Sequence, residues 1–375
     1  MTRPRVMFVI SSLDGGGAAR VIVDLADFLA RQGLEVAITT LEGHQADFYP
    51  VPPSVARVRL DIMWESRGLL ARLRSTLQRL RIIRQALQQA DPDIVVSFID
   101  MTNIRVLLAL AGTQIPVVVC ERSDPRHHPL GIMWRVLRLV IYRLASRIVV
   151  QTEGVATWAR RRFSAQRVVT IPNAVRPPGL MKPAPRPRGM PGQRVIIGMG
   201  RLVQQKGFDR LILAFSSSGL ASKGWSLAIL GDGNLRPQLE ALVEKEGLAN
   251  RVYFPGTQRI PEEWLLNADI FVLSSHYEGF PNVLLEAMQC GVATLAFNCD
   301  SGPGEIIRHG VDGWLVRPND VVALGNALCL LAEHTILRKS LSAQATAVLR
   351  RFSCEAVYSQ WKLLCETLLV ERRES

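Results

Sequence analysis

The segment from His276 to Ala287, HYEGFPNVLLEA, combines groups that could bind a sugar and a phosphate. It follows the apolar run 270–273, and a glycine and a proline interrupt the chain before a helix that should begin near Asn282. The first-turn amides of such a helix have no partner within the helix and carry partial positive charge, which favours an anion. Glu278 precedes the helix and Glu286 lies inside it. Because carboxylates accept hydrogen bonds from hydroxyl groups, the pair suits a ribose and a hexose; a capped helix with two surface glutamates is the alternative.

Two other loops have compositions typical of phosphate binding. Residues 200–207, GRLVQQKG, follow an expected strand and place Arg201 and Lys206 five residues apart. A guanidinium offers a planar fork of donors and an ammonium a point charge, so these two cations suit a diphosphate. Residues 11–17, SSLDGGG, open a helix after the first strand, and consecutive glycines let the backbone approach an anion closely. Solvated charges in the first loop and a tight turn in the second are the alternatives.

Short β-branched runs alternate with helical patterns in both halves of the chain. In the N-terminal half the expected strands are 5–10, 35–40, 94–97, 117–120 and 148–151, and the helices include 18–31 and 69–89. In the C-terminal half the strands are 195–199, 226–230, 252–254, 270–273 and 293–296, and the helices include 234–247, 282–289 and 321–333. This alternation predicts parallel sheets covered on both faces, and therefore two Rossmann-like domains. Ligands of such sheets bind outside the carboxyl ends of the strands, so a cleft between the domains is the expected site.

A proline-rich segment divides these halves. Residues 176–193, RPPGLMKPAPRPRGMPGQ, should form neither a helix nor a central strand, because proline lacks an amide donor and restricts its predecessor. We therefore predict an N-terminal domain over 1–176, a linker over 177–193 and a C-terminal domain over 194–352. A C-terminal helix near 353–371 is expected to pack back on the first domain.

These segments resemble retaining glycosyltransferases of family 4. The resemblance rests on the E-x7-E pair Glu278 and Glu286, on the GRLVQQKG loop and on the early GGG loop, in this order and spacing. The segments 121–125, ERSDP, and 300–307, DSGPGEII, resemble members that build bacterial oligosaccharides and exopolysaccharides. The resemblance implies the GT-B fold, in which two Rossmann-like domains face each other across a deep cleft. It also implies that the N-terminal domain takes the acceptor and the C-terminal domain the nucleotide-sugar donor.

The resemblance further implies roles for individual residues. Arg201 and Lys206 would neutralise the donor diphosphate, which becomes the leaving group. Glu286 would hold the nucleotide ribose, and Glu278 the donor sugar. The other donor-binding candidates act through their backbone and are Gly15, Gly16, Gly200, Phe280, Asn282 and Val283. Retention of configuration on one face of the sugar needs no dedicated base.

One segment departs from the family pattern. Many relatives place a histidine after the strand that corresponds to 117–120, beside the donor sugar, whereas this chain has Glu121 and Arg122 there. We predict these two as further catalytic residues, ahead of His127, which lies a few residues late. His127 and His128 are a poor metal pair because adjacent side chains diverge and no third ligand is near.

No metal or cofactor is predicted to be required. The DxD-like Asp91-Pro92-Asp93 precedes a strand at its amino end, away from the expected site, and is interpreted as a helix end and turn.

The positive charge is concentrated in one half of the chain. The net charge is +12, and residues 1–176, with 24 Arg and no Lys, account for +10 of it. Arginines flank an apolar stripe in 65–90 and alternate with apolar and aromatic residues in 131–147. Basic amphipathic helices of this kind suit an anionic bilayer surface and a lipid-diphosphate acceptor, although they could also simply cover the sheet.

The lengths of the apolar runs and the spacing of the cysteines indicate the cellular compartment. No apolar run reaches the length of a membrane span, and the N-terminal apolar run is too short for a signal peptide. Six cysteines lie singly, which is typical of a reducing compartment. We expect a cytoplasmic protein, peripheral on the inner face of the plasma membrane.

The leading hypothesis is a retaining enzyme of cell-surface glycan synthesis. It would move a hexose or N-acetylhexosamine from a nucleotide-diphosphate sugar, expected to be a UDP-sugar, to a membrane lipid-linked saccharide. Alternatives are an epimerase or phosphorylase of the same fold, a nucleic-acid binder and a dinucleotide oxidoreductase. Nucleic-acid binding is disfavoured because only 6% of residues are aromatic. The oxidoreductase lacks its GxGxxG fingerprint.

Overall fold

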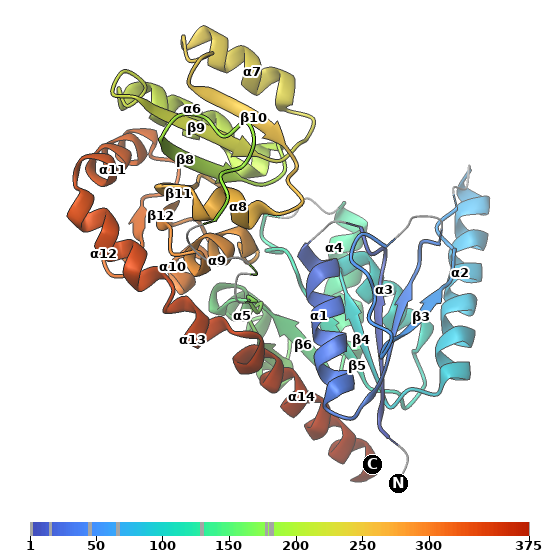
Figure 1. Ribbon diagram of the computed structural model, residues 1–375. Coiled ribbons are helices and arrows are strands. Elements are labelled where there is room, and N and C mark those ends of the chain that lie inside the picture. The colour runs from blue at the N-terminus through green and yellow to red at the C-terminus, as the bar shows by residue number, and fades with distance from the viewer. Residues whose placement is uncertain are drawn as a thin grey trace. The chain divides into compact units, whose positions relative to one another are not determined.

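The chain forms two compact units in the computed structural model, which describes residues 3–14, 17–43, 47–64, 68–127, 131–176, 179 and 184–374. The first unit comprises Met1–Ala174 and Glu355–Ser375, and the second comprises Val175–Cys354. Each unit contains one parallel sheet with helices against it (Figure 1).

In the described part of the first unit, seven parallel strands lie in the order β3-β2-β1-β4-β5-β6-β7. Their bounds are β1 (Arg5–Ile10), β2 (Glu35–Thr40), β3 (Ala56–Arg59), β4 (Ile94–Phe98), β5 (Val117–Cys120), β6 (Arg147–Val150) and β7 (Val168–Thr170). Every residue of β4 and β5 is buried, as expected for central strands that are covered on both faces. The order reverses between β1 and β4, which makes this edge a topological switch point.

Helices cover both faces of this sheet. They are α1 (Gly17–Arg31), α2 (Leu69–Ala90), α3 (Asp100–Ala109), α4 (Ile132–Ile141), α5 (Glu153–Arg160) and α14 (Cys354–Glu374), with 3-10 turns η1 (Tyr142–Leu144) and η2 (Ala165–Arg167). One apolar cluster joins β1, β4, β5 and β6 to α2, α3, α4 and α5, so these four helices share a face.

The opposite face carries the C-terminal helix. Buried residues of α14 recur at spacings of three and four, and they include Tyr358 and Trp361. The Trp361 ring stacks on Phe98 of β4 with centroids 6.2 Å apart, and Tyr358 lies 5.5 Å from Phe28 of α1. Figure 1 shows α14 beside α1 in this unit. The last helix of the chain is therefore part of the core of the first unit.

The second unit repeats the design with six parallel strands in the order β10-β9-β8-β11-β12-β13. They are β8 (Arg194–Met199), β9 (Trp225–Leu230), β10 (Val252–Gly256), β11 (Ile270–Leu273), β12 (Ala293–Phe297) and β13 (Trp314–Val316). The helices are α6 (Phe208–Ser217), α7 (Arg236–Lys245), α8 (Pro261–Leu266), α9 (Asn282–Gln289), α10 (Pro303–Ile306), α11 (Val321–Glu333), α12 (Thr335–Ala345) and α13 (Val348–Phe352), with the 3-10 turn η3 (Gln204–Lys206). One apolar cluster contains α6, α7 and α11, and another contains α8, α9 and α13.

The sequence pattern did not predict three of these strands. These are β3, β7 and β13, which lie at sheet edges and are three or four residues long. None of them has an uninterrupted buried run, so the apolar pattern that reveals a central strand is missing. The ten strands that were predicted are present, with ends that differ by at most two residues.

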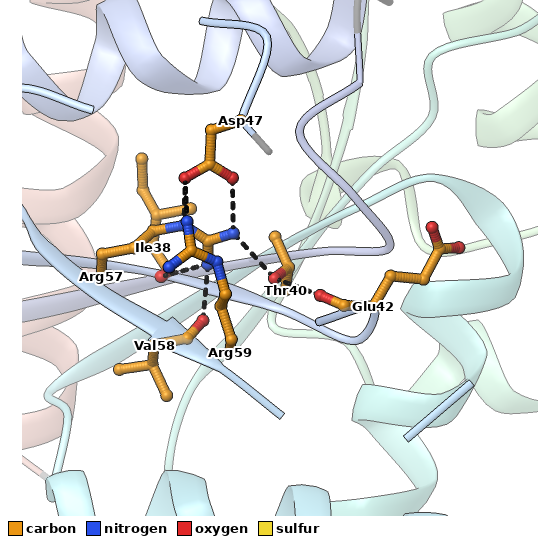
Figure 2. A network of polar contacts seen from close by, with 7 residues as sticks. All are labelled: Ile38, Thr40, Glu42, Asp47, Arg57, Val58 and Arg59. Atoms are coloured by element: carbon orange, nitrogen blue, oxygen red, sulfur yellow. Dashed lines mark hydrogen bonds and ion pairs between the residues drawn. The ribbon is translucent and has the colours of Figure 1, made fainter. Parts of the chain in front are cut away.

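A cluster of charged and polar side chains connects the edge strand β3 to β2 and to Asp47 (Figure 2). Arg57 Nη2 lies 2.9 Å from Asp47 Oδ1, and Arg59 Nη2 lies 2.6 Å from Asp47 Oδ2. Arg57 also donates to Thr40 Oγ1 at 2.9 Å, which ties the cluster to β2. The hydrogen bond from Arg57 lowers the pKa of Asp47. Phe48, the next residue, donates its amide to Leu13 O at 3.0 Å, so the cluster also supports the start of the glycine-rich loop.

Among the described residues, no single helix is both long and apolar enough to cross a bilayer. The bent pair Val321–Glu333 and Thr335–Phe352 passes on length and composition, with a bend of 97°. Its apolar residues, including Leu324, Leu328 and Val348, are packed in the clusters of the second unit.

Candidate functional site

Three loops of the second unit meet where the order of its sheet reverses. Strand β8 lies between β9 and β11, and all three run parallel, so their carboxyl ends share one edge. We call residues 200–207, 231–233 and 274–281, which follow these strands, the switch-point loops. In doubly wound sheets this edge is where ligands bind.

An ion pair between a buried glutamate and a partly buried lysine joins two of the predicted residues. Lys206 Nζ donates to Glu278 Oε1 at 2.6 Å, and Ser275 Oγ donates to the same oxygen at 2.6 Å. Glu278 is 4% exposed. The structure therefore places the ammonium of one loop beside the carboxylate of the next, although they are 72 residues apart in the chain.

Backbone contacts hold the two loops at close range. Gly207 has φ 58°, and a Cβ atom there would lie 2.3 Å from Ser274 O. The amide of His276 donates to Gln205 O at 2.8 Å, and Ser274 Oγ donates to Lys206 O at 2.9 Å. Only glycine combines this φ with so close an approach, so Gly207 sets the spacing that brings Lys206 to Glu278.

Sequence reasoning missed the third loop, which contains Gly231 and Gly233. A Cβ atom at Gly231 would lie 2.0 Å from Gly200 O, and one at Gly233 would lie 2.5 Å from Leu202 O. Leu202 donates its amide to Asp232 O at 2.9 Å. The G-D-G triplet directly after an expected strand was the signal that could have revealed this support.

The remaining cation lies in the loop 200–207, and the second glutamate lies in the helix that follows the loop 274–281. Arg201, the second residue after β8, is exposed and has no ion-pair or hydrogen-bond partner for its side chain in the described part of the chain. Glu286 lies in the second turn of α9 and is largely buried. Gly200, with φ 154°, packs against the Lys206 side chain, as an added Cβ would lie 3.2 Å from Lys206 Cε.

The start of α9 has no side-chain cap. Its N-cap residue is Pro281, and Asn282 and Val283 are its first helical residues. The Phe280 side chain packs in the core, 5.8 Å from the Phe352 ring, so only its backbone can serve a ligand. Gly302 supports this turn from the loop after β12, because a Cβ there would lie 2.5 Å from Pro281 Cδ.

Glu121 and Arg122 follow β5 in the first unit. Glu121 is 3% exposed, and its Oε1 lies 3.8 Å from Arg138 Nη1. Burial raises the pKa of Glu121 to about 7, although the Arg138 charge opposes the shift. Arg122 Nη2 donates to Asn173 Oδ1 at 2.7 Å, and its guanidinium lies 4.8 Å from the Phe98 ring centroid. Burial lowers the pKa of Arg122 to about 10.

The remaining candidates from the sequence are the glycines of the first loop, the two adjacent histidines and the DxD-like segment. Gly15, Gly16 and His128 lie outside the described residues. His127 is exposed. Asp93, of the DxD-like segment, accepts the Arg5 amide at 2.8 Å and pairs with Arg372. Within the described ranges, no group of three or more His, Cys, Asp or Glu side chains could hold a metal.

Comparison with solved structures identifies the fold. HepE from Anabaena, solved in complex with UDP, matches with a TM-score of 0.77 and 20% identity over 97% of this chain and 100% of that one. The predicted fold is confirmed: two parallel α/β sheets that match structures of GT-B glycosyltransferases.

Two family models and two curated relatives give the family. The model for Glycosyltransferase Family 4 matches residues 15–177, and the model for Glycosyl transferases group 1 matches residues 185–348. A Campylobacter jejuni enzyme, GalNAc-alpha-(1->4)-GalNAc-alpha-(1->3)-diNAcBac-PP-undecaprenol alpha-1,4-N-acetyl-D-galactosaminyltransferase, is 26% identical over 96% of this chain and 98% of its own length. The exopolysaccharide phosphotransferase of Streptomyces coelicolor is 33% identical over 78% of this chain, which spans only 30% of that protein.

The chain belongs to glycosyltransferase family 4, a family of retaining enzymes that use nucleotide-sugar donors. It is related to enzymes of lipid-linked glycan, exopolysaccharide and lipopolysaccharide synthesis. The resemblance drawn from the sequence motifs is thereby confirmed.

Proposed function

We propose that this enzyme transfers a hexose or an N-acetylhexosamine from a UDP-sugar to a lipid-linked saccharide at an anionic membrane. The observation that carries the donor half is the Lys206–Glu278 contact of 2.6 Å at the switch point of the second sheet. A nucleotide-sugar has a diphosphate next to a sugar ring, so a cation next to a buried carboxylate matches both groups at once.

The switch-point loops and α9 would each bind a different part of the donor. Arg201 and Lys206 take the diphosphate, Glu278 the sugar hydroxyls and Glu286 the ribose. The backbone of Phe280, Asn282 and Val283 would add amides near the start of α9, while Gly200 and the Gly15–Gly16 loop would border the phosphates. As the bond from the sugar to the diphosphate breaks, negative charge builds on the leaving phosphate, where fixed cations and amides stabilise it. The acceptor hydroxyl attacks from the same face and gives its proton to the departing phosphate oxygen, and no metal is required.

The first unit would take the acceptor, with Glu121 and Arg122 beside the reacting groups. Its apolar surface supports a lipid-linked acceptor. Helix α4 and the turn that follows it expose a row of large apolar side chains, which are Ile132, Met133, Val136, Val140 and Leu144. Leu73 and Leu77 of α2 are also exposed, whereas Ile83 and Leu87 of the same helix pack in the core. Exposed apolar residues among arginines are typical of helices that lie on anionic bilayers.

The relatives support the finer assignment. The Campylobacter enzyme is named for transfer of an N-acetylgalactosaminyl group to an undecaprenol-diphosphate saccharide, and HepE was solved with UDP. The arginine-rich first unit favours the inner face of the plasma membrane, where anionic lipids concentrate, with the protein bound peripherally from the cytoplasm.

The deciding experiment screens labelled UDP-hexoses and UDP-N-acetylhexosamines with polyprenyl-diphosphate saccharides in vesicles. We expect one sugar to be transferred, with the anomeric configuration of the donor retained by NMR. Transfer to the same saccharide without its polyprenyl-diphosphate lipid, measured as the control, should be much slower. Equal rates on both acceptors would contradict the lipid-linked acceptor, and an altered free sugar without a transfer product would favour the epimerase alternative.

A further inference from the structure

A cationic cavity of about 480 Å³ lies in the first unit between α4, α5 and the segment that follows β5. Six of the side chains that line it carry the inference, and they are Arg126, Arg135, Arg138, Arg161, Arg162 and Trp158. We call it the arginine cavity. Its volume is that of a small-molecule site, but such sites are usually lined by apolar side chains. A lining of five guanidinium groups is suited to an anion with several oxygen atoms.

The arginine cavity has more positively charged side chains than acidic partners. Asp124, which is fully buried, pairs with Arg126 at 2.6 Å, and Glu121 lies 3.8 Å from Arg138. No acidic side chain is among the cavity's lining residues in the described part of the chain. Arg135 and Arg161 are exposed, and within the same described ranges their side chains have no ion-pair or hydrogen-bond partner. The excess of at least two charges gives an anion a reason to bind.

Arg138 gives the cavity a buried guanidinium group whose acceptors are distant. The residue is 3% exposed, and its Nε and Nη1 atoms are buried without a hydrogen-bond partner among the described residues. Its Nη2 donates to Pro125 O at 3.5 Å and its Nη1 lies 3.8 Å from Glu121 Oε1, so both contacts are long and the buried charge of Arg138 is only partly compensated, which favours an anion nearby. The Trp158 ring fixes the geometry, because the guanidinium of Arg138 lies 5.2 Å from its centroid and that of Arg162 lies 4.7 Å.

The arginine cavity opens beside the apolar row of α4. Arg135, Arg138 and Leu139 line the cavity from α4, and the same helix exposes Ile132, Val136 and Val140. Leu139 belongs to both surfaces, since it lines the cavity and is 37% exposed. A ligand that fits this pair of surfaces has a phosphate group joined to an alkyl chain.

We infer that the arginine cavity seats the diphosphate of the lipid-linked acceptor, while the apolar row of α4 receives the first part of its lipid chain. This inference rests on the proposed function and names the part of the chain that recognises its acceptor. A diphosphate, with two adjacent phosphoryl groups, matches the several arginines better than the single phosphodiester of a phospholipid headgroup.

Binding of inorganic pyrophosphate tests the cavity without any transfer reaction. The full chain is kept saturated with UDP, so that the donor site is occupied, and pyrophosphate is titrated by calorimetry. The double variant Arg135→Gln/Arg161→Gln should bind about tenfold more weakly or worse, because it loses charge-assisted hydrogen bonds. Arg3→Gln/Arg373→Gln removes two exposed arginines of the same unit from outside the cavity and should change the affinity less than twofold. No binding to the wild type, or equal affinity in the cavity variant, would overturn the inference.

Vesicles distinguish the two sources of phosphate. Phosphatidylcholine vesicles with phosphatidylglycerol are compared with the same vesicles containing polyprenyl diphosphate. We expect polyprenyl diphosphate to strengthen binding of the wild type and of Arg3→Gln/Arg373→Gln, and to have little effect on the cavity variant. If the cavity variant instead loses its binding to phosphatidylglycerol and the polyprenyl lipid adds nothing to the wild type, the cavity serves phospholipid headgroups and the inference is wrong.

Kinetics separates this inference from the proposed function. The cavity variant should raise the KM for the lipid-linked acceptor about tenfold, with kcat and the donor KM unchanged. An unchanged acceptor KM would overturn the cavity assignment. A wild type that binds pyrophosphate and polyprenyl diphosphate but transfers no sugar would support the cavity and refute the proposed function.

Discussion

The switch-point loops of the second unit and the arginine cavity of the first unit are both cationic, but they are held in different ways. In the switch-point loops, backbone contacts at glycines fix the spacing, and Glu278 already compensates Lys206. In the arginine cavity, side chains from three segments supply the charge, and Arg135 and Arg161 have no partner in the described part of the chain. The switch-point loops are preorganised, so adding or removing a few atoms there should change activity strongly. The arginine cavity distributes its charge over several side chains, so each arginine that is removed should lower the affinity for an anion by a moderate amount.

The largest effect is expected from the charged residues of the switch-point loops. Arg201→Ala, Lys206→Ala and Glu278→Ala should each lower kcat for transfer by about 100- to 1,000-fold, because each removes a group that the proposed function assigns to the leaving diphosphate or to the sugar. Steady-state rates with a saturating acceptor measure this. Lys339→Ala, which changes an exposed lysine of the same unit, should have no effect. Near wild-type turnover in any two of the three variants would refute this assignment of the site.

Gly207→Ala tests whether the backbone contact sets the position of Lys206. The added Cβ would lie 2.3 Å from Ser274 O, so the two loops must separate. We expect kcat/KM for the donor to fall about 10- to 100-fold, since a small misplacement of a positioning group is costly. Gly219→Ala is the matched control: its φ of 66° imposes similar strain, but no atom lies within 4 Å of the new Cβ. Equal losses in the two variants would mean that backbone strain alone is responsible.

Glu121→Gln tests the protonation of Glu121, which lies 3.8 Å from Arg138 of the arginine cavity, through the pH dependence of folding stability. Burial raises the pKa of Glu121 to about 7 from an ordinary value of 4.5, so the folded state holds a proton that the unfolded state releases. The stability of the wild type relative to the variant should therefore fall as pH rises from 4.5 to 7, by on the order of 2–3 kcal/mol. Melting temperatures at pH 5 and pH 8 measure it, with a relative drop of roughly 5 °C or more for the wild type. Parallel pH profiles would contradict the raised pKa.

The smallest effect is expected at the edge of the first sheet. Asp47→Asn removes the acceptor of Arg57 and Arg59 and should cost about 1 kcal/mol near pH 7. The hydrogen bond from Arg57 lowers the pKa of Asp47 below 3.8, so this stabilisation is present above pH 4 and is lost as the pH falls further. Urea unfolding at pH 7 and pH 3 tests the sign. Glu35→Gln, in an exposed pair with Arg5, should change stability by less than half as much.

The contrast between the two regions also explains which parts were predictable from the sequence. Lys206 and Glu278 lie in loops that directly follow buried strands, so a strand pattern and a charged loop sufficed to indicate them. The contribution of Gly231 is visible only as a contact with Gly200, a residue 31 positions earlier. The arginine cavity was not predicted because Arg126, Arg135 and Arg161 become neighbours only through packing of α4 and α5. The edge strands lacked a buried run. The exposed pair Leu73 and Leu77 of α2 has the same spacing as the buried pair Ile83 and Leu87, so spacing alone does not separate them.

The place of α14 has a consequence for synthesis of the protein on the ribosome. The second unit is a continuous stretch, Val175–Cys354, and all of its strands and helices are available once that stretch has emerged. The first unit begins earlier, but Phe98 on its sheet is covered by Trp361 from the last helix. Domains usually complete their folding in the order in which they are made. In this chain we expect the reverse order of completion, because the unit whose synthesis begins first keeps Phe98 uncovered until α14, which follows the whole second unit, has been made.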